Sequence, residues 1–167
     1  LTASVARLLS TAEQEDPEFA AQCEEDRLQL AAIRQSRESK AAEWFEAHAE
    51  DWDDLRRLHS PDEQVEAVLR VALEESPLGE MLDIGTGTGR MAELFAGRAS
   101  RIVALDKSLE MLRVARAKLQ HLPADKVELV QGDFLSLPFD SGSFDTVLFH
   151  QVLHYAPDPL VPLREAA

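Results

Sequence analysis

Met81-Leu82-Asp83-Ile84-Gly85-Thr86-Gly87-Thr88-Gly89-Arg90 is the stretch that decides the fold of this 167-residue chain. An apolar run carrying an acid is followed by three glycines at alternate positions and a helix-like segment, which predicts a strand, a tight turn and a helix. Glycine permits backbone angles that side chains forbid and lets a ligand approach the main chain. The helix start favours an anionic group through its free N–H groups and its dipole. The stretch therefore predicts a nucleotide-type binding turn.

Two classes of ligand use such a turn. The dinucleotide pattern Gly-x-Gly-x-x-Gly/Ala fails from Gly85, because its sixth position is Arg90, but it fits in a shifted frame from Gly87 to Ala92. Asp83 separates the classes, since a carboxylate at the strand tip repels a pyrophosphate and attracts the ammonium group of a zwitterionic amino acid. A nicotinamide dehydrogenase is thereby disfavoured. An ordinary turn without a ligand is the remaining alternative.

Composition narrows the class of protein. A hydrophobic fraction of 45% and a charged fraction of 29% are typical of a soluble globular protein. The formal net charge of −14 argues against this chain gripping a nucleic-acid backbone. No apolar run approaches the roughly 20 residues that cross a bilayer, and no segment resembles a signal peptide. We therefore expect a cytoplasmic protein that does not bind membranes.

The cysteine content and the chain ends add two expectations. The single cysteine, Cys23, excludes an internal disulfide and a multi-cysteine metal site, and the histidines form no metal-binding pattern, so no metal is predicted. The chain begins with Leu1 rather than Met, and residues 163–167 read as the middle of a helix. We expect a piece of a longer protein, truncated at both ends.

Residues 1–58 predict an α-helical arm, and residues 59–167 a separate domain. The arm lacks glycine and has one proline, Pro17, which suits the first turn of a long helix after a short apolar one. Residues at spacings of three and four keep roughly one stripe along that long helix, although Asp26 and Arg37 interrupt it: Phe19, Cys23, Leu30, Ile33, Ala41, Trp44 and His48. A helix of this kind is about 45 Å long. We expect it to form a homodimer with its twin; the alternative is a solvated helix docked on its own domain.

From residue 60 onward, helices and strands alternate. Ser60-Pro61-Asp62-Glu63 predicts a helix start with a capping box. Strands are predicted at 81–84, 101–106, 127–130 and 144–149, with a helix between the first and second and another, capped by Ser108, between the second and third. Repeated βα units imply a mostly parallel sheet with right-handed crossovers. The fold class is therefore α/β, the first four strands of a Rossmann-like sheet behind the helical arm.

Polar groups follow each predicted strand, where ligands of such sheets bind. Asp106 ends the second strand 21 positions after Gly85, at the offset of an acid that accepts hydrogen bonds from ribose hydroxyls. Gly132-Asp133-Phe134 follows the third strand; its carboxylate suits an adenine amine and its ring suits the base. His150-Gln151 follows the fourth. A helix-capping acid and a simple turn acid are the alternatives for Asp106 and Asp133.

Successive motifs resemble those of class I S-adenosylmethionine-dependent methyltransferases. They are Asp83 to Gly89, Asp106 to Leu112, Gln131 to Asp133, Leu137 to Phe139, Ser143 to Asp145 and His150 to Tyr155. The resemblance implies S-adenosyl-L-methionine as cofactor, with S-adenosyl-L-homocysteine as product. It assigns cofactor binding to Asp83, Gly85, Thr86, Gly87, Gly89, Asp106, Lys107, Met111, Gly132, Asp133, Phe134, His150 and Gln151. The catalytic base is not identified; His150 is the candidate.

The whole chain also resembles ArsR-type winged-helix regulators that carry a methyltransferase domain. In these proteins a helical connector with an aromatic-rich end, here Trp44-Phe45 through Trp52-Asp53, leads into the cofactor domain. The chain departs from them because it has no basic DNA-reading segment and no multiple cysteines. We expect a methyltransferase that acts on a small molecule. The alternative is a ligand-sensing transcription regulator that contacts DNA only through a domain absent from this chain.

Overall fold

The computed structural model describes residues 2–59, 62–75 and 77–167. The chain divides into two compact units, residues 1–41 and 42–167. The division does not coincide with the domain boundary predicted between residues 58 and 59, which stays a prediction. The predicted helix start at Ser60 and Pro61 lies outside the described residues.

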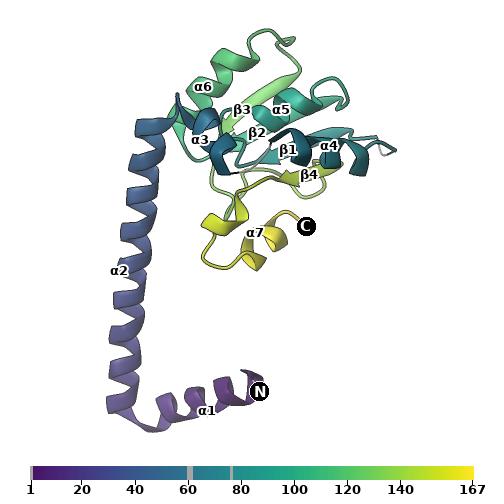
Figure 1. Cartoon of the computed structure of the whole chain (residues 1–167). Helices are drawn as coiled ribbons and strands as arrows, with labels where there is room; N and C mark the ends of the chain where they lie inside the picture. The colour runs from purple at the N-terminus through teal and green to yellow at the C-terminus, as the bar shows by residue number, and fades with distance from the viewer. Residues whose placement is uncertain (1, 60–61, 76) are drawn as a thin grey trace. The chain divides into compact units, whose positions relative to one another are not determined.

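The first unit consists of two helices joined at Asp16 (Figure 1). α1 spans Thr2–Glu15, and α2 spans Pro17–His48 and continues into the second unit. The Asp16 carboxylate accepts the backbone N–H groups of Glu18 and Phe19 at 3.0 and 3.2 Å, so an acid caps α2 while Pro17 occupies its first position. The long helix predicted from Pro17 is confirmed.

The second unit begins with the end of α2 and a short helix that the sequence patterns did not predict. α2 ends at His48, and the Asp51 N–H donates to the His48 carbonyl at 3.2 Å. The Asp51 carbonyl in turn accepts two backbone N–H groups that open α3, Trp52–His59. α4 follows over Asp62–Ala72. The helical segment is therefore broken at residues 49–51.

A four-stranded parallel sheet forms the centre of the second unit, as predicted (Figure 1). Its elements are β1 Glu80–Ile84, α5 Arg90–Phe95, β2 Arg101–Asp106, α6 Leu109–Leu119, β3 Val127–Gln131, β4 Thr146–Phe149, the 3-10 helix η1 Leu153–Tyr155 and α7 Leu160–Glu165. The strand order is β3-β2-β1-β4, and Ile84 pairs with both Leu105 and Phe149. β1 therefore lies inside the sheet, with β2 on one side and β4 on the other.

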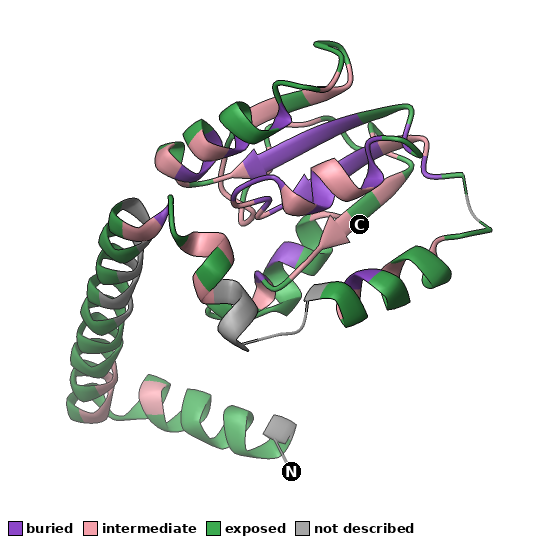
Figure 2. Cartoon of the chain, turned by 45° about the horizontal axis from the view of Figure 1, so that its top comes forward, coloured by how far each residue is buried: buried purple, intermediate pink, exposed green. Residues whose placement is uncertain are grey.

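Both faces of the sheet are covered, and its central strands are buried (Figure 2). Alternate strand residues serve opposite faces. Met81, Ile102 and Ala104 pack against helices α5 and α6, with α4 contributing at the margin. Leu82, Ile84, Val103 and Leu105 pack against Phe134, Leu137, Phe139, Phe144, Phe149 and Ala166. Burial on both faces explains why β1 and β2 are nearly continuous apolar runs rather than alternating apolar and polar residues.

No helix in the described part of the chain is both long enough and apolar enough to span a membrane.

Candidate functional site

The strand order places the topological switch point of the sheet, which we call the crevice, at the carboxyl ends of β1 and β4. From β1 the chain moves to β2 and β3 on one side, and then crosses back to β4 on the other. At such a reversal, the connections leaving neighbouring strands run to opposite faces, and ligands of doubly wound sheets bind in the opening between them. The glycine turn after β1 and the segment after β4 both lie at this position.

Gly85 and Gly87 have different reasons to be glycine. Both adopt left-handed backbone angles, with φ of 70° and 56°. A Cβ on Gly85 would lie 2.4 Å from Cγ2 of Val152, so the segment after β4 packs directly on the turn. Within the described part of the chain, a Cβ on Gly87 would meet only Nε1 of Trp52, at 3.7 Å. Gly87 is thus the glycine of the turn with room beside it.

Gly89, the third glycine, allows two helices to approach each other. A Cβ there would lie 2.9 Å from Leu119 Cδ1 and 3.3 Å from Ala115 Cβ, both on α6. The glycine brings the start of α5 against α6 and so fixes the direction in which α5 leaves the turn.

Asp83 lies beneath the turn. Its side chain is buried, and its Oδ2 atom accepts a hydrogen bond of 2.6 Å from the Thr86 hydroxyl. Burial raises the pKa of Asp83 to about 6; the Thr86 hydrogen bond opposes this rise, and the negative charge of Asp106 adds to it. In this structure the buried carboxyl stabilises the turn through its hydrogen bond with Thr86. Its predicted contact with an ammonium group stays a prediction.

Asp106 joins the end of β2 to the turn. Its Oδ2 atom accepts the Gly87 N–H at 2.8 Å, and its Oδ1 atom accepts the Ser108 N–H at 2.9 Å. Burial raises the pKa of Asp106 while these N–H groups oppose the rise. The Ser108 hydroxyl accepts the Met111 N–H at 3.3 Å, which confirms the predicted cap of α6. Met111 itself is buried, and its predicted part in cofactor binding stays a prediction.

Two residues predicted to bind the cofactor, Lys107 and Asp133, are neighbours in space. Lys107 Nζ lies 3.0 Å from Oδ2 of Asp133, and the Leu135 N–H donates to Oδ1 at 2.9 Å. Burial alone would raise the pKa of Asp133, but the Leu135 N–H and Lys107 outweigh it and hold that pKa below its usual value. Phe134 packs against the sheet face that contains Leu105. The ends of β2 and β3 therefore form one polar edge.

The segment after β4 carries a strained residue. Gln151 has φ of 55°, the only positive φ of a non-glycine residue in the described part of the chain. Such a conformation costs roughly 1–2 kcal/mol for an L-residue. The Nε2 atom of the adjacent His150 is buried. Strain of this kind concentrates at ligand sites. The next residue, Val152, packs over Gly85.

Sequence patterns missed the contribution of α3 to the site. The Thr88 hydroxyl donates to Oδ1 of Asp53 at 2.6 Å, and the other Asp53 oxygen pairs with Lys118 on α6. Trp52, the preceding residue, lies beside Gly87. Two tryptophans near the end of a charged helix could have indicated that this segment packs on the domain. Nothing in the sequence around residues 52 and 53, however, indicates that Asp53 contacts Thr88, 35 positions away.

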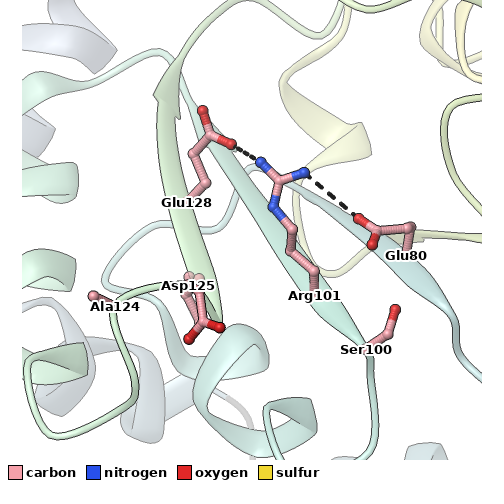
Figure 3. Close-up of a pocket in the computed structure, with 7 residues that line it drawn as sticks. Glu80, Ser100, Arg101, Ala124, Asp125 and Glu128 are labelled. Atoms are coloured by element: carbon pink, nitrogen blue, oxygen red, sulfur yellow. Dashed lines mark hydrogen bonds and ion pairs between the residues drawn. The ribbon is translucent and has the colours of Figure 1, made fainter.

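A shallow recess lies at the opposite end of the strands (Figure 3). Arg101 lies between Glu80 and Glu128 in it, with Nη1 3.7 Å from Oε2 of Glu80. Because these residues begin β1 and β2 or lie early in β3, the recess is at the amino ends of the strands, away from the crevice. Its arginine is already paired with two carboxylates, so the recess lacks the features of a cofactor site.

Within the residues that the structure describes, no three histidine, cysteine or acidic side chains are grouped as a metal site. The groups brought together at the crevice are the glycine turn, carboxylates and backbone N–H groups. This chemistry suits an organic ligand with hydroxyl and amine donors.

A doubly wound sheet with a glycine turn after one strand and an acid after the next defines a domain that binds a nucleotide-type cofactor. The family model described as a methyltransferase domain matches residues 82–167. The chain therefore belongs to the methyltransferase domain family.

Relatives of this chain include two enzymes and one solved complex. Demethylmenaquinone methyltransferase of Lactococcus lactis is 36% identical over 51% of this chain and 35% of its own length. Protein-L-isoaspartate O-methyltransferase 2 of Rhodopseudomonas palustris is 32% identical over 60% of this chain and 46% of its own. The DhpI complex with S-adenosyl-L-homocysteine (SAH) has a TM-score of 0.57 and 27% identity, covering 75% of this chain and 61% of DhpI.

The chain spans only 29%, 35% and 58% of the lengths of the first curated relatives that it matches. The family match starts at Leu82, so α1 to α4 lie outside it.

Proposed function

We propose that the protein binds S-adenosyl-L-methionine in the crevice and transfers its methyl group to a small-molecule acceptor, releasing SAH. The observation that carries this proposal is the Asp106 carboxylate, held at the rim of the glycine turn by the Gly87 and Ser108 N–H groups. Membership of the methyltransferase domain family and the likeness to the DhpI–SAH complex support it.

Each polar group of the crevice suits one part of that cofactor. The Asp106 oxygens, each with one N–H donor, keep lone pairs that accept ribose hydroxyls. Lys107, Asp133 and Phe134 border the adenine at the shared edge of β2 and β3. Gly87 leaves room for the methionine part beside the main chain. These assignments are the predicted ones, now with geometry that is compatible with them.

The bound cofactor supplies an activated methyl on a sulfonium, and the protein supplies orientation and removal of water. Val152 and the residues before it close the crevice on the β4 side. His150, at the end of β4, is proposed as the group that takes the proton of the acceptor. His150→Gln should then lower methyl transfer by a larger factor than it weakens SAH binding.

The test of the function is transfer of a radioactive methyl group from S-adenosylmethionine. A panel of small hydroxyl, amine and quinol acceptors is compared with a panel of proteins, because the relatives are named for both kinds of substrate. We expect label in a small molecule and its loss in Asp106→Ala. Label only in proteins, or transfer that Asp106→Ala leaves unchanged, would contradict the proposal.

We also propose that the helical arm pairs with a second copy of the chain. Exposed apolar side chains favour this: Val5, Leu8, Leu9, Leu28, Leu30 and Ile33. Equilibrium sedimentation should give a dimer that becomes a monomer when Leu30 and Ile33 are both replaced by Glu. A monomer at every concentration would contradict the proposal.

The exposed arm is also the observation that favours the alternative, a regulator that senses its ligand and reaches DNA through a segment outside this chain. In that case SAH should bind without supporting turnover on any acceptor.

A further inference from the structure

Trp52 lies beside the glycine turn although it belongs to a helix outside the family match. Among the described residues, its Nε1 atom is the one protein atom within 4 Å of the position that a Cβ on Gly87 would take, apart from chain neighbours. The distance is 3.7 Å, an ordinary van der Waals contact. A ligand that approaches Gly87 on the side of this Cβ position therefore also approaches the indole of Trp52.

Asp53 fixes the start of α3 to two other elements. One carboxylate oxygen accepts the Thr88 hydroxyl at 2.6 Å, and the other pairs with Lys118 of α6. Thr88 is only 2% exposed and the Asp53 side chain 20%, so this hydrogen bond is partly shielded from water. The residue after Trp52 is thus tied both to the turn and to the helix that follows β2.

A second aromatic ring limits where the indole can move. The Trp44 ring lies edge-on to Trp52 with centroids 5.9 Å apart, and it stacks on His48 at 4.5 Å. Trp44, His48 and Trp52 all belong to the unit of residues 42–167. The indole is therefore held by packing as well as by the Asp53 contacts.

We propose that Trp52 forms one wall of the cofactor site, where its indole covers the methionine part of S-adenosylmethionine, and that Asp53 is the positioning residue that keeps it there. The inference rests on the proposed function. A methionine part with an ammonium and a sulfonium suits an aromatic ring, because both cations are attracted to its face. The segment before the family match thereby completes a site that the matched residues begin.

Fluorescence tests the position of Trp52, because the chain has only two tryptophans. Trp44→Phe leaves Trp52 as the one indole and keeps an aromatic ring beside it. Addition of SAH to this variant should shift the emission and reduce quenching by acrylamide. Trp52→Phe, which leaves Trp44, is the matched control and should respond much less. Trp52→Ala should raise the Kd for SAH roughly three- to tenfold.

Calorimetry on the same variants separates the possible failures. SAH that binds Trp44→Phe by calorimetry without changing its emission or quenching would overturn the inference and leave the proposed function standing. Absence of SAH binding to the unmodified chain would overturn both.

Two variants of Thr88 test the positioning role of Asp53 in the Trp44→Phe background. Thr88→Val removes the hydroxyl at nearly constant volume, whereas Thr88→Ser keeps it. We expect Thr88→Val to increase acrylamide quenching of Trp52 and to raise the Kd for SAH about threefold or more, with Thr88→Ser close to the parent. If the two folded variants behave alike, Asp53 does not position Trp52.

Discussion

Replacement of Gly87 by alanine separates the stability of the turn from its role in binding. Gly87 has φ of 56°, and among the described residues a Cβ there meets only Trp52, at 3.7 Å. The free energy of unfolding of Gly87→Ala should therefore fall by roughly 1–2 kcal/mol, the cost of placing an L-residue in the left-handed region. A ligand seated beside the main chain meets the new methyl group, however, and overpacking typically costs about 1–3 kcal/mol.

Gly142 provides the matched control. It has φ of 76°, no atom of the described residues lies within 4 Å of the place that its Cβ would take, and it lies on an exposed loop away from the crevice. Gly142→Ala should lose about as much stability as Gly87→Ala in urea unfolding. In calorimetric titration only Gly87→Ala should bind SAH more weakly, by roughly 5- to 150-fold. Equal affinity in Gly87→Ala and the parent, or an equal loss in both variants, would refute the reasoning.

Three further predictions follow from the geometry of the crevice. Gly85→Ala should lower the free energy of unfolding by about 2–5 kcal/mol, because its Cβ would overlap Val152, and Val152→Ala should restore part of the loss; full stability in urea would contradict that packing. Asp83 keeps its proton up to about pH 6 in the native state but only to about pH 3.8 in the unfolded state. The native state therefore binds more protons between these values, and the free energy of unfolding falls as the pH rises from about 4 to 6. Asp83→Asn should remove up to about 3 kcal/mol of that fall, and a pH profile identical to the parent's would show that the carboxyl is not buried. Gln151→Gly should raise the melting temperature by relieving a φ of 55°, corresponding to about 1 kcal/mol, whereas a lower melting temperature would mean that the side chain contributes more than the strain costs.

The sheet could be predicted from sequence because its signals are local. Each strand is a short apolar run, and Ser108 precedes α6 with the hydroxyl that its first turn requires. The apolar run that predicts a strand at residues 101–106 also places Asp106 at the end of β2. Its two hydrogen bonds to backbone N–H groups were not predicted, since they depend on how the turn folds back toward β2.

The depth of Asp83 could not be predicted for a similar reason. Its place two residues before the first glycine suggested a carboxyl at the strand tip that faces a ligand. The structure adds that the Thr86 hydroxyl, three residues later, donates a hydrogen bond to the carboxylate from the turn above it. Sequence gives the identity of both groups, but their separation depends on the left-handed glycine between them.

The role of α3 depends on contacts across the chain. Asp53 and Thr88 are 35 positions apart, and Trp52 belongs to a segment that looks like a charged connector. No periodicity links such residues, because packing between distant elements is set by the whole fold. The same holds for Val152, which meets Gly85 only once β4 has paired with β1.

Calorimetric titration with SAH, with NAD as the comparison ligand, tests the central claim most directly. The chain should bind SAH saturably with one site and should not bind NAD, and Asp106→Ala should weaken SAH binding by about tenfold or more. Binding of NAD but not SAH would contradict the assignment of the crevice to S-adenosylmethionine.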